Sequence, residues 1–116
     1  MNTLFILNDP PYGTERSYNA LRLARSLLDQ KSSDVRVFLM GDAAACAHGG
    51  QKVPQGYYNI GDMLGAVLRR GGGVGVCGTC MDARGITAEL LIEGANRSAL
   101  AQLTDWTAAA DKVLVF

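Results

Sequence analysis

This sequence contains little cysteine and histidine, and neither sign of charge is in excess. Three cysteines and one histidine occur among 116 residues, and eleven basic residues balance eleven acidic ones. A small, odd number of cysteines argues against a disulfide framework and for free thiols. A net charge near zero gives no reason to expect nucleic acid or an acidic membrane surface as a partner.

The sequence also lacks a long hydrophobic run. No apolar segment approaches the roughly 18 to 20 residues that a membrane-spanning helix needs. The short apolar run at residues 4–7 has no basic segment before it and is interrupted by Asp9 and Pro10, so it does not resemble a signal peptide. We therefore expect no membrane partner and a cytoplasmic location, where thiols stay reduced.

Apolar residues are nevertheless numerous enough for one hydrophobic core. They make up 48% of the chain, which is close to the average of globular domains, and we predict a single domain over residues 1–116.

Apolar runs predict strands at residues 3–7, 35–40, 74–77 and 112–116, with a brief strand near 94–96. Helical spacing predicts helices over 15–30, 60–70 and 99–109, a helical turn over 43–47 and a short helix within 85–93. Thr14, Asn59 and Ser98 are the expected N-caps. This alternation of strands and helices predicts an α/β fold, with a parallel sheet covered by helices on both faces.

Two of the three cysteines lie in one glycine-rich turn. Cys77 ends a short β-branched run, Cys80 follows three residues later, and Arg84 comes four residues after that. Cysteine reacts as its thiolate, which nearby cations and helix N-termini favour. The carboxyl end of a parallel strand is also where open α/β sheets place their sites. We predict that Cys77 is a nucleophile whose pKa is lowered by Arg84 and by backbone N–H groups of the turn.

Several kinds of chemistry are open to this pair. A thioredoxin-like dithiol would exchange with a substrate disulfide. Such pairs usually open a helix directly, however, and residues 81–85 are more typical of a loop. A metal site would need Cys46 and His48 as further ligands, and their spacing is wrong for a closed zinc site. A sulfur carrier would hold a persulfide on one thiolate, with Arg84 stabilising the anion. The remaining interpretation is that both cysteines are buried and inert. The glycine-rich turn and its arginine make this interpretation less favoured.

Two loops supply further candidates for substrate binding. Asn8, Tyr12 and Gly13 follow the first strand at the same sheet edge as Cys77, where a helix N-terminus could hold an anion. This loop has neither the Walker nor the Rossmann glycine pattern. Lys52 lies in a long polar loop at residues 48–58 and could bring a cation near the thiols. Asp82, inside the cysteine segment, completes the predicted substrate-binding set.

Taken together, segments along nearly the whole chain resemble the DsrE/DsrF-like family, in particular its YchN-like branch. The resemblance rests on Asn8, Pro11-Tyr12-Gly13, Leu21-Arg22-Leu23-Ala24, Val37-Phe38-Leu39-Met40-Gly41-Asp42-Ala43, Gly50-Gln51-Lys52, Cys77-Gly78-Thr79-Cys80-Met81-Asp82-Ala83-Arg84-Gly85, Trp106-Thr107 and Ala110-Asp111-Lys112-Val113-Leu114.

The resemblance implies a three-layer α/β/α sandwich on a five-stranded, mainly parallel sheet, and a homohexamer or, alternatively, a trimer. Better-known relatives, the TusD and DsrE proteins, carry sulfur as a cysteine persulfide between donor and acceptor proteins. Cys77, followed by Arg84-Gly85, matches the position of their acceptor thiol, and Cys80 is an extra thiol of the YchN-like branch. Sulfur relay is therefore the expected function, with Cys77, Cys80 and Arg84 as catalytic residues and no cofactor or metal. A thiol-disulfide oxidoreductase and a non-catalytic oligomeric binding module are the alternatives.

Overall fold

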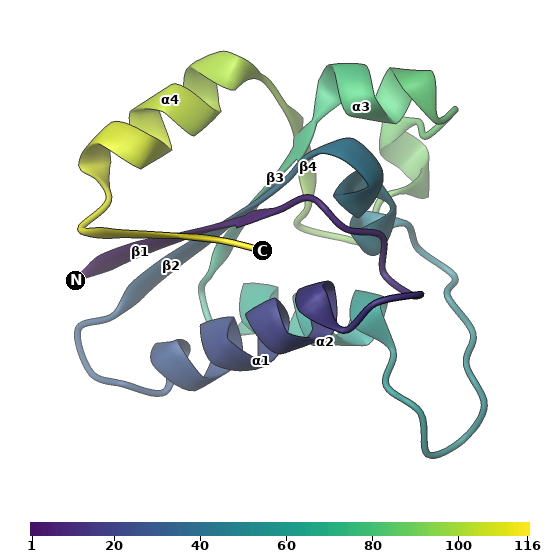
Figure 1. Cartoon of the computed structure of the whole chain (residues 1–116), viewed down its shortest axis with the longest axis horizontal. Helices are drawn as coiled ribbons and strands as arrows, with labels where there is room; N and C mark the ends of the chain where they lie inside the picture. Colours follow the sequence, from purple (N-terminus) through teal and green to yellow (C-terminus); the bar gives the residue numbers. More distant parts are fainter.

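The computed structural model describes residues 1–116 as a parallel sheet with helices on both faces (Figure 1). The strands are β1 (Asn2–Leu7), β2 (Asp34–Leu39), β3 (Gly73–Cys77), β4 (Asn96–Ser98) and β5 (Lys112–Val115). The α-helices are α1 (Arg16–Leu28), α2 (Ile60–Arg69), α3 (Gly78–Ala83) and α4 (Leu100–Ala109), and the 3-10 helices are η1 (Gly41–Ala47) and η2 (Ala88–Leu90). The predicted α/β fold is confirmed.

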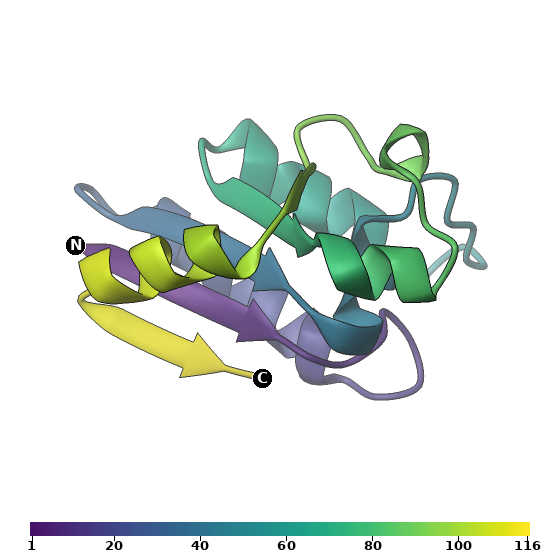
Figure 2. The same ribbon diagram turned by 90° about the horizontal axis from the view of Figure 1, so that it is seen from above.

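The five strands are all parallel and lie in the order β4-β3-β2-β1-β5. Helices α1 and α2 cover one face of this sheet, while α4 lies on the other (Figures 1 and 2). Because all strands run in one direction, the residues that follow β1, β2 and β3 share one edge of the sheet. Cys77, the last residue of β3, therefore lies at the edge where the sequence predicts it.

The core is divided unequally between the two faces. A cluster of 20 buried residues fills the space between the sheet and the α1–α2 layer. On the α4 face the buried cluster contains only Leu4, Phe38 and Leu103. Trp106 is half-buried there and meets Phe38 edge-on, with the ring planes at 87°. The thinner packing on this face leaves room for a cavity beside Cys77.

Most predicted elements are confirmed to within a few residues. Asn59 caps α2 as predicted, since its side chain accepts a hydrogen bond from the backbone N–H of Asp62 over 2.9 Å. Helix α1 begins one residue later than predicted, with Glu15 at the N-cap position instead of Thr14. Helix α4 likewise begins after Ala99, not after Ser98.

The segment after Cys77 differs from its prediction. Residues 81–85 were expected to form a loop, but helix α3 begins directly after Cys77 and continues to Ala83. A helix of six residues is too short to show apolar periodicity, and Met81, which is fully buried, anchors it to the core. The short helix expected within 85–93 is reduced to η2, and the brief strand lies at β4, two residues later than predicted.

Candidate functional site

Cys77 is the residue at which β3 ends and α3 begins. It has non-helical backbone angles (φ −56°, ψ 116°) and occupies the N-cap position of α3, so its thiol lies beside the free N–H groups of the first helical turn. The Sγ atom is 3.4 Å from the hydroxyl oxygen of Thr79, and the residue is half-buried. The thiol is thus held by polar groups and still accessible from outside.

These polar groups decide the acidity of Cys77. Partial burial acts to raise its pKa, but hydrogen bonds from the Cys80 thiol, the Thr79 hydroxyl and the backbone N–H groups of both residues outweigh burial. The pKa of Cys77 is therefore lower than that of an ordinary cysteine. The thiolate, which is the reactive form, is correspondingly more populated near neutral pH.

Cys80 has the opposite acidity. The hydrogen bond that it gives to Cys77 raises its pKa most, and burial raises it further. The backbone N–H of Gly41, which donates to its Sγ atom over 3.1 Å, and the positive charge of Arg84 act in the other direction without prevailing. The pair therefore consists of one thiol with a lowered pKa and one with a raised pKa.

A cavity of about 510 Å³ opens beside the two cysteines. It lies between the first turn of α3, strand β4 and helix α4. Its apolar wall is formed mainly by Phe38, Met40, Leu100 and Leu103. Ser98 and Arg97 supply polar groups, and Arg97 is the one cationic residue in the lining. The cavity offers space for a largely apolar group beside Cys77.

Arg84 does not act on Cys77 in the expected way. Its guanidinium forms two hydrogen bonds with Asp42, of 3.0 and 2.8 Å, and a third with the carbonyl oxygen of Cys80. Arg84 therefore faces η1 and Cys80. The expectation that it lowers the pKa of Cys77 is wrong, because its charge is directed to this other side of α3. The backbone N–H groups of the turn act as predicted.

Arg97 is the site residue that sequence reasoning missed. It lies on β4, next to the end of β3, and lines the cavity together with Cys77. Its guanidinium pairs with both carboxylate oxygens of Asp82, at 2.7 and 3.0 Å. The structure shows the carboxylate of Asp82, which is predicted to bind substrate, holding this arginine. A partner 15 residues away on a three-residue strand leaves no local signal in the sequence.

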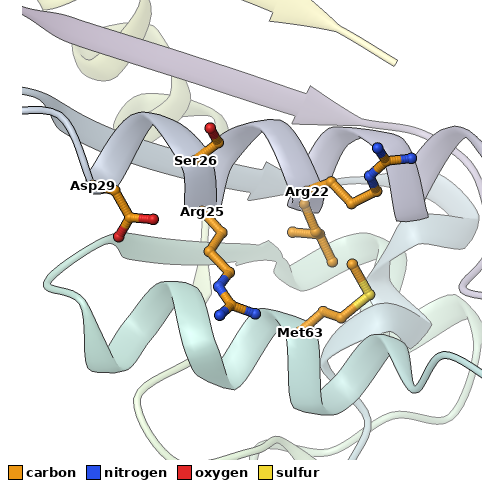
Figure 3. Close-up of a pocket in the computed structure, with 6 residues that line it drawn as sticks. Arg22, Arg25, Ser26, Asp29 and Met63 are labelled. Atoms are coloured by element: carbon orange, nitrogen blue, oxygen red, sulfur yellow. The ribbon is translucent and has the colours of Figure 1, made fainter.

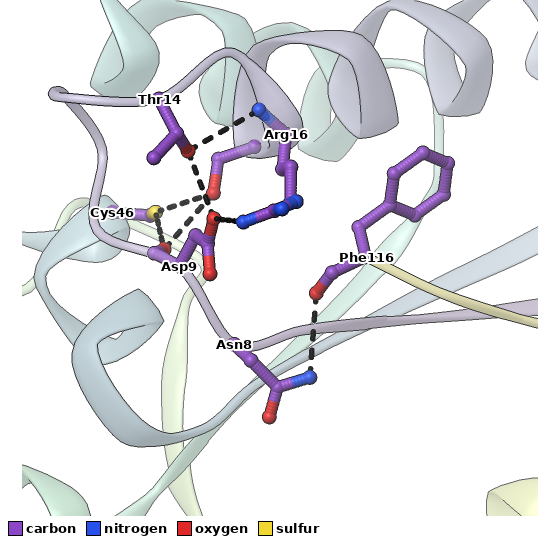
Figure 4. A network of polar contacts seen from close by, with 7 residues as sticks. Asn8, Asp9, Thr14, Arg16, Cys46 and Phe116 are labelled. Carbon is purple, nitrogen blue, oxygen red and sulfur yellow. Dashed lines mark hydrogen bonds and ion pairs between the residues drawn. The ribbon is translucent and has the colours of Figure 1, made fainter.

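The other residues predicted to bind substrate lie outside the cavity. The Asn8 side chain donates to the carbonyl oxygen of Phe116 at the end of the chain (Figure 4). The Tyr12 hydroxyl donates to Gln51 and accepts from the backbone N–H of Ile60, in the α1–α2 layer. Gly13 has a φ angle of +105° that favours glycine, and Lys52 is exposed. None of these four contributes to the cavity at Cys77.

The third cysteine and a hollow between α1 and α2 have no chemistry comparable to that of Cys77. Cys46 is buried, with its Sγ atom 3.7 Å from the Ser17 hydroxyl (Figure 4), and burial raises its pKa to about 11. A hollow of about 280 Å³ between α1 and α2 is lined by Arg22, Arg25 and Met63 among others, and it holds no cysteine (Figure 3).

No group of three or more histidine, cysteine or acidic side chains could hold a metal ion. No helix has the length and apolar character to cross a membrane.

Comparison with known proteins identifies the family. The family model of the DsrE/DsrF-like family matches residues 1–116. Protein YchN of Escherichia coli strain K12 is 44% identical over 114 residues, which cover 97% of both chains. The uncharacterized protein MJ0989 of Methanocaldococcus jannaschii is 34% identical over 116 residues, and the alignment covers all of both chains. This chain belongs to the DsrE/DsrF-like family.

Solved structures agree with this assignment. The crystal structure of YchN from E. coli superposes with a TM-score of 0.93 at 42% identity, covering 99% of this chain and 98% of the other. The protein MTH1491 of Methanobacterium thermoautotrophicum, whose function is unknown, superposes with a TM-score of 0.79 at 13% identity. That second likeness concerns the fold alone.

Proposed function

We propose that this protein carries sulfur as a persulfide on Cys77. The observation that carries the proposal is the acidity and access of this thiol. Cys77 is half-buried at the start of α3, its pKa is lowered by hydrogen bonds, and it opens onto a cavity that can receive a reaction partner. Membership of the DsrE/DsrF-like family supports sulfur chemistry at this position.

The loading step transfers one sulfur atom and needs no external oxidant or reductant. The Cys77 thiolate attacks the outer sulfur of a donor persulfide, R–S–SH. A new S–S bond forms at Cys77, the S–S bond of the donor breaks, and the donor leaves as its thiolate, R–S⁻. Cys77 then holds the sulfur as Cys–S–SH, and delivery to an acceptor thiol repeats the same exchange in the other direction.

Cys80 limits the lifetime of this persulfide. Its thiolate can attack the Sγ atom of Cys77, release HS⁻ and leave a Cys77–Cys80 disulfide. Because hydrogen bonding to Cys77 and burial raise the pKa of Cys80, little of it is ionised near neutral pH and this side reaction is slowed. The same arrangement therefore favours a nucleophilic Cys77 and a protected product.

Mass spectrometry of the protein treated with sodium polysulfide and then freed of reagent tests the proposal. We expect one added sulfur atom on the peptide that contains Cys77, and none on the Cys77→Ser variant. Cys80→Ser is the matched control, because it removes the neighbouring thiol and should load Cys77 and hold the sulfur longer. A protein that loads no sulfur on Cys77, or loads it equally on Cys46, contradicts the proposal.

Thiol-disulfide exchange is the second candidate, and one observation favours it. Helix α3 begins directly after Cys77, so the Cys77–Cys80 pair opens a helix, as is usual for redox dithiols. An oxidoreductase would need Cys80 to resolve the mixed disulfide with its substrate. The Cys80→Ser variant would then lose turnover in a disulfide-reduction assay and trap mixed disulfides at Cys77, whereas a sulfur carrier would not. If neither cysteine variant changes any sulfur or redox assay, a non-catalytic binding module is the remaining function.

A further inference from the structure

Arg97 lies against the first turn of α3, and the absence of a side chain at Gly78 makes this possible. A Cβ atom placed on Gly78 would lie only 2.7 Å from the Cζ atom of Arg97. The Nη1 atom of Arg97 donates to the carbonyl oxygen of Gly78 over 3.1 Å. Gly78 is the residue next to Cys77, so the guanidinium is fixed beside the turn that holds the reactive thiol.

Asp82 holds the same guanidinium from the second turn of α3. The two carboxylate oxygens accept hydrogen bonds of 2.7 and 3.0 Å from Nη1 and Nη2 of Arg97. Arg97 lowers the pKa of Asp82 through this contact. In turn, Asp82 raises the pKa of Arg97 most, and the negative charge of an ionised Cys77 raises it further. The cation and the carboxylate therefore form one ion pair beside the turn that holds Cys77.

We propose that Arg97 and Asp82 form a charge pair that positions and tunes the sulfur of Cys77, with the guanidinium favouring an anionic sulfur and the carboxylate limiting that effect. The role rests on the proposed function insofar as the sulfur is carried as a persulfide. Arg97 is a positioning residue in this scheme, since it acts through the turn and through its charge without touching the Sγ atom.

The two members of the pair should have opposite effects on the ionisation of Cys77. A positive charge near a thiol favours its ionised form, and a negative charge disfavours it. The outer sulfur of a persulfide extends from Sγ by one S–S bond of about 2 Å. Because Arg97 and Cys77 line the same cavity, we expect this outer sulfur to lie in the field of the guanidinium. The pair therefore acts on the empty and on the loaded form of Cys77.

Two single variants of the full chain separate this role from a merely structural one. Arg97→Gln removes the cation. We expect the pH midpoint of Cys77 alkylation to rise by about 0.5 pH unit, as for a partly screened charge several ångströms away. Asp82→Asn removes the carboxylate while the Gly78 carbonyl still holds Arg97, and we expect the midpoint to fall. If the pair only fastened β4 to α3, both variants would break the same contact and would shift the midpoint in the same direction.

The measurement is the rate of iodoacetamide alkylation against pH, followed at the Cys77 peptide by mass spectrometry. Arg70→Gln and Asp29→Asn are the matched controls, because Arg70 and Asp29 form an ion pair of 3.3 Å away from this site, and they should leave the midpoint unchanged. Arg97→Lys keeps the charge and should restore part of the Arg97→Gln shift. In 1 M salt the opposite shifts should shrink. Circular dichroism identifies any variant that fails to fold.

Shifts of equal sign in Arg97→Gln and Asp82→Asn, or no shift in either, would overturn the charge-pair proposal. This outcome is distinct from failure of the carrier function. Alkylation midpoints are measured without any sulfur donor, so they respond to the charge pair even if polysulfide never loads Cys77. Conversely, if both variants load sulfur normally and neither shifts the alkylation midpoint, the carrier function stands and the charge-pair proposal is rejected.

Discussion

The backbone N–H of Gly41 donates a hydrogen bond to the Sγ atom of Cys80 over 3.1 Å. Gly41 begins η1, so this bond connects the segment after β2 with helix α3 after β3. The ion pair between Arg84 and Asp42 joins the same two segments. Cys80 is thereby held on the η1 side of α3, and hydrogen bonding from its thiol lowers the pKa of Cys77.

Replacing Cys80 with alanine should therefore make Cys77 less acidic. The variant removes the Cys80 thiol, whose hydrogen bond is the largest of the effects that lower the pKa of Cys77. We expect the alkylation midpoint of Cys77 to rise in Cys80→Ala and to rise less in Cys80→Ser, because a serine hydroxyl can still donate. Iodoacetamide rates against pH provide the measurement. A lower midpoint in Cys80→Ala would show that the second thiol opposes ionisation of the first.

Replacing Gly78 with alanine should affect chemistry more than stability. The added Cβ would meet the end of the flexible Arg97 side chain, which can move aside. Alanine also has a better helix propensity than glycine, by up to about 1 kcal/mol in a helix interior. We expect a change in the free energy of unfolding of less than about 1 kcal/mol, together with a Cys77 midpoint shifted upward as in Arg97→Gln. Urea denaturation and alkylation measure the two effects, and a large loss of stability with an unchanged midpoint would contradict this account.

The position of Cys77 could be predicted from the sequence, whereas its surroundings could not. Apolar runs such as Leu4 to Leu7 and the alternation of elements specify a parallel sheet, and a parallel sheet brings the ends of its strands to one edge. Helix α3 was missed because six residues carry no periodic pattern. Arg97 was missed because its contact with Asp82 depends on β4 pairing with β3, which is a long-range event. For the same reason Arg84 was assigned to the wrong thiol.

Self-association stays a prediction, since the structure holds one chain. We expect a homohexamer, with a trimer as the alternative, and contacts that include Tyr12 and residues 48–58. Within the chain Tyr12 is half-buried and hydrogen-bonded, while Tyr57 in the same loop region is 70% exposed. Multi-angle light scattering at micromolar concentration measures the mass, and Tyr57→Ser should weaken the assembly if the loop lies in a contact. A monomer under these conditions would contradict the prediction.

The buried thiol of Cys46 should make stability depend on alkaline pH. Burial raises its pKa from the usual 9.0 to about 11 in the folded state, so the unfolded chain loses this proton at lower pH than the folded protein. Stability from this group is therefore complete below pH 9, declines as the pH rises above 9, and is fully lost once the pH passes the folded-state value. A shift of this size corresponds to roughly 3 kcal/mol in the free energy of unfolding once it is fully expressed. Urea denaturation at pH 8 and pH 10.5 should show a larger loss for the wild-type protein than for Cys46→Ala. Because all other ionisable groups are common to the two proteins, the difference between the two losses isolates Cys46. Equal losses would show that this thiol ionises as easily in the folded protein as in the unfolded chain.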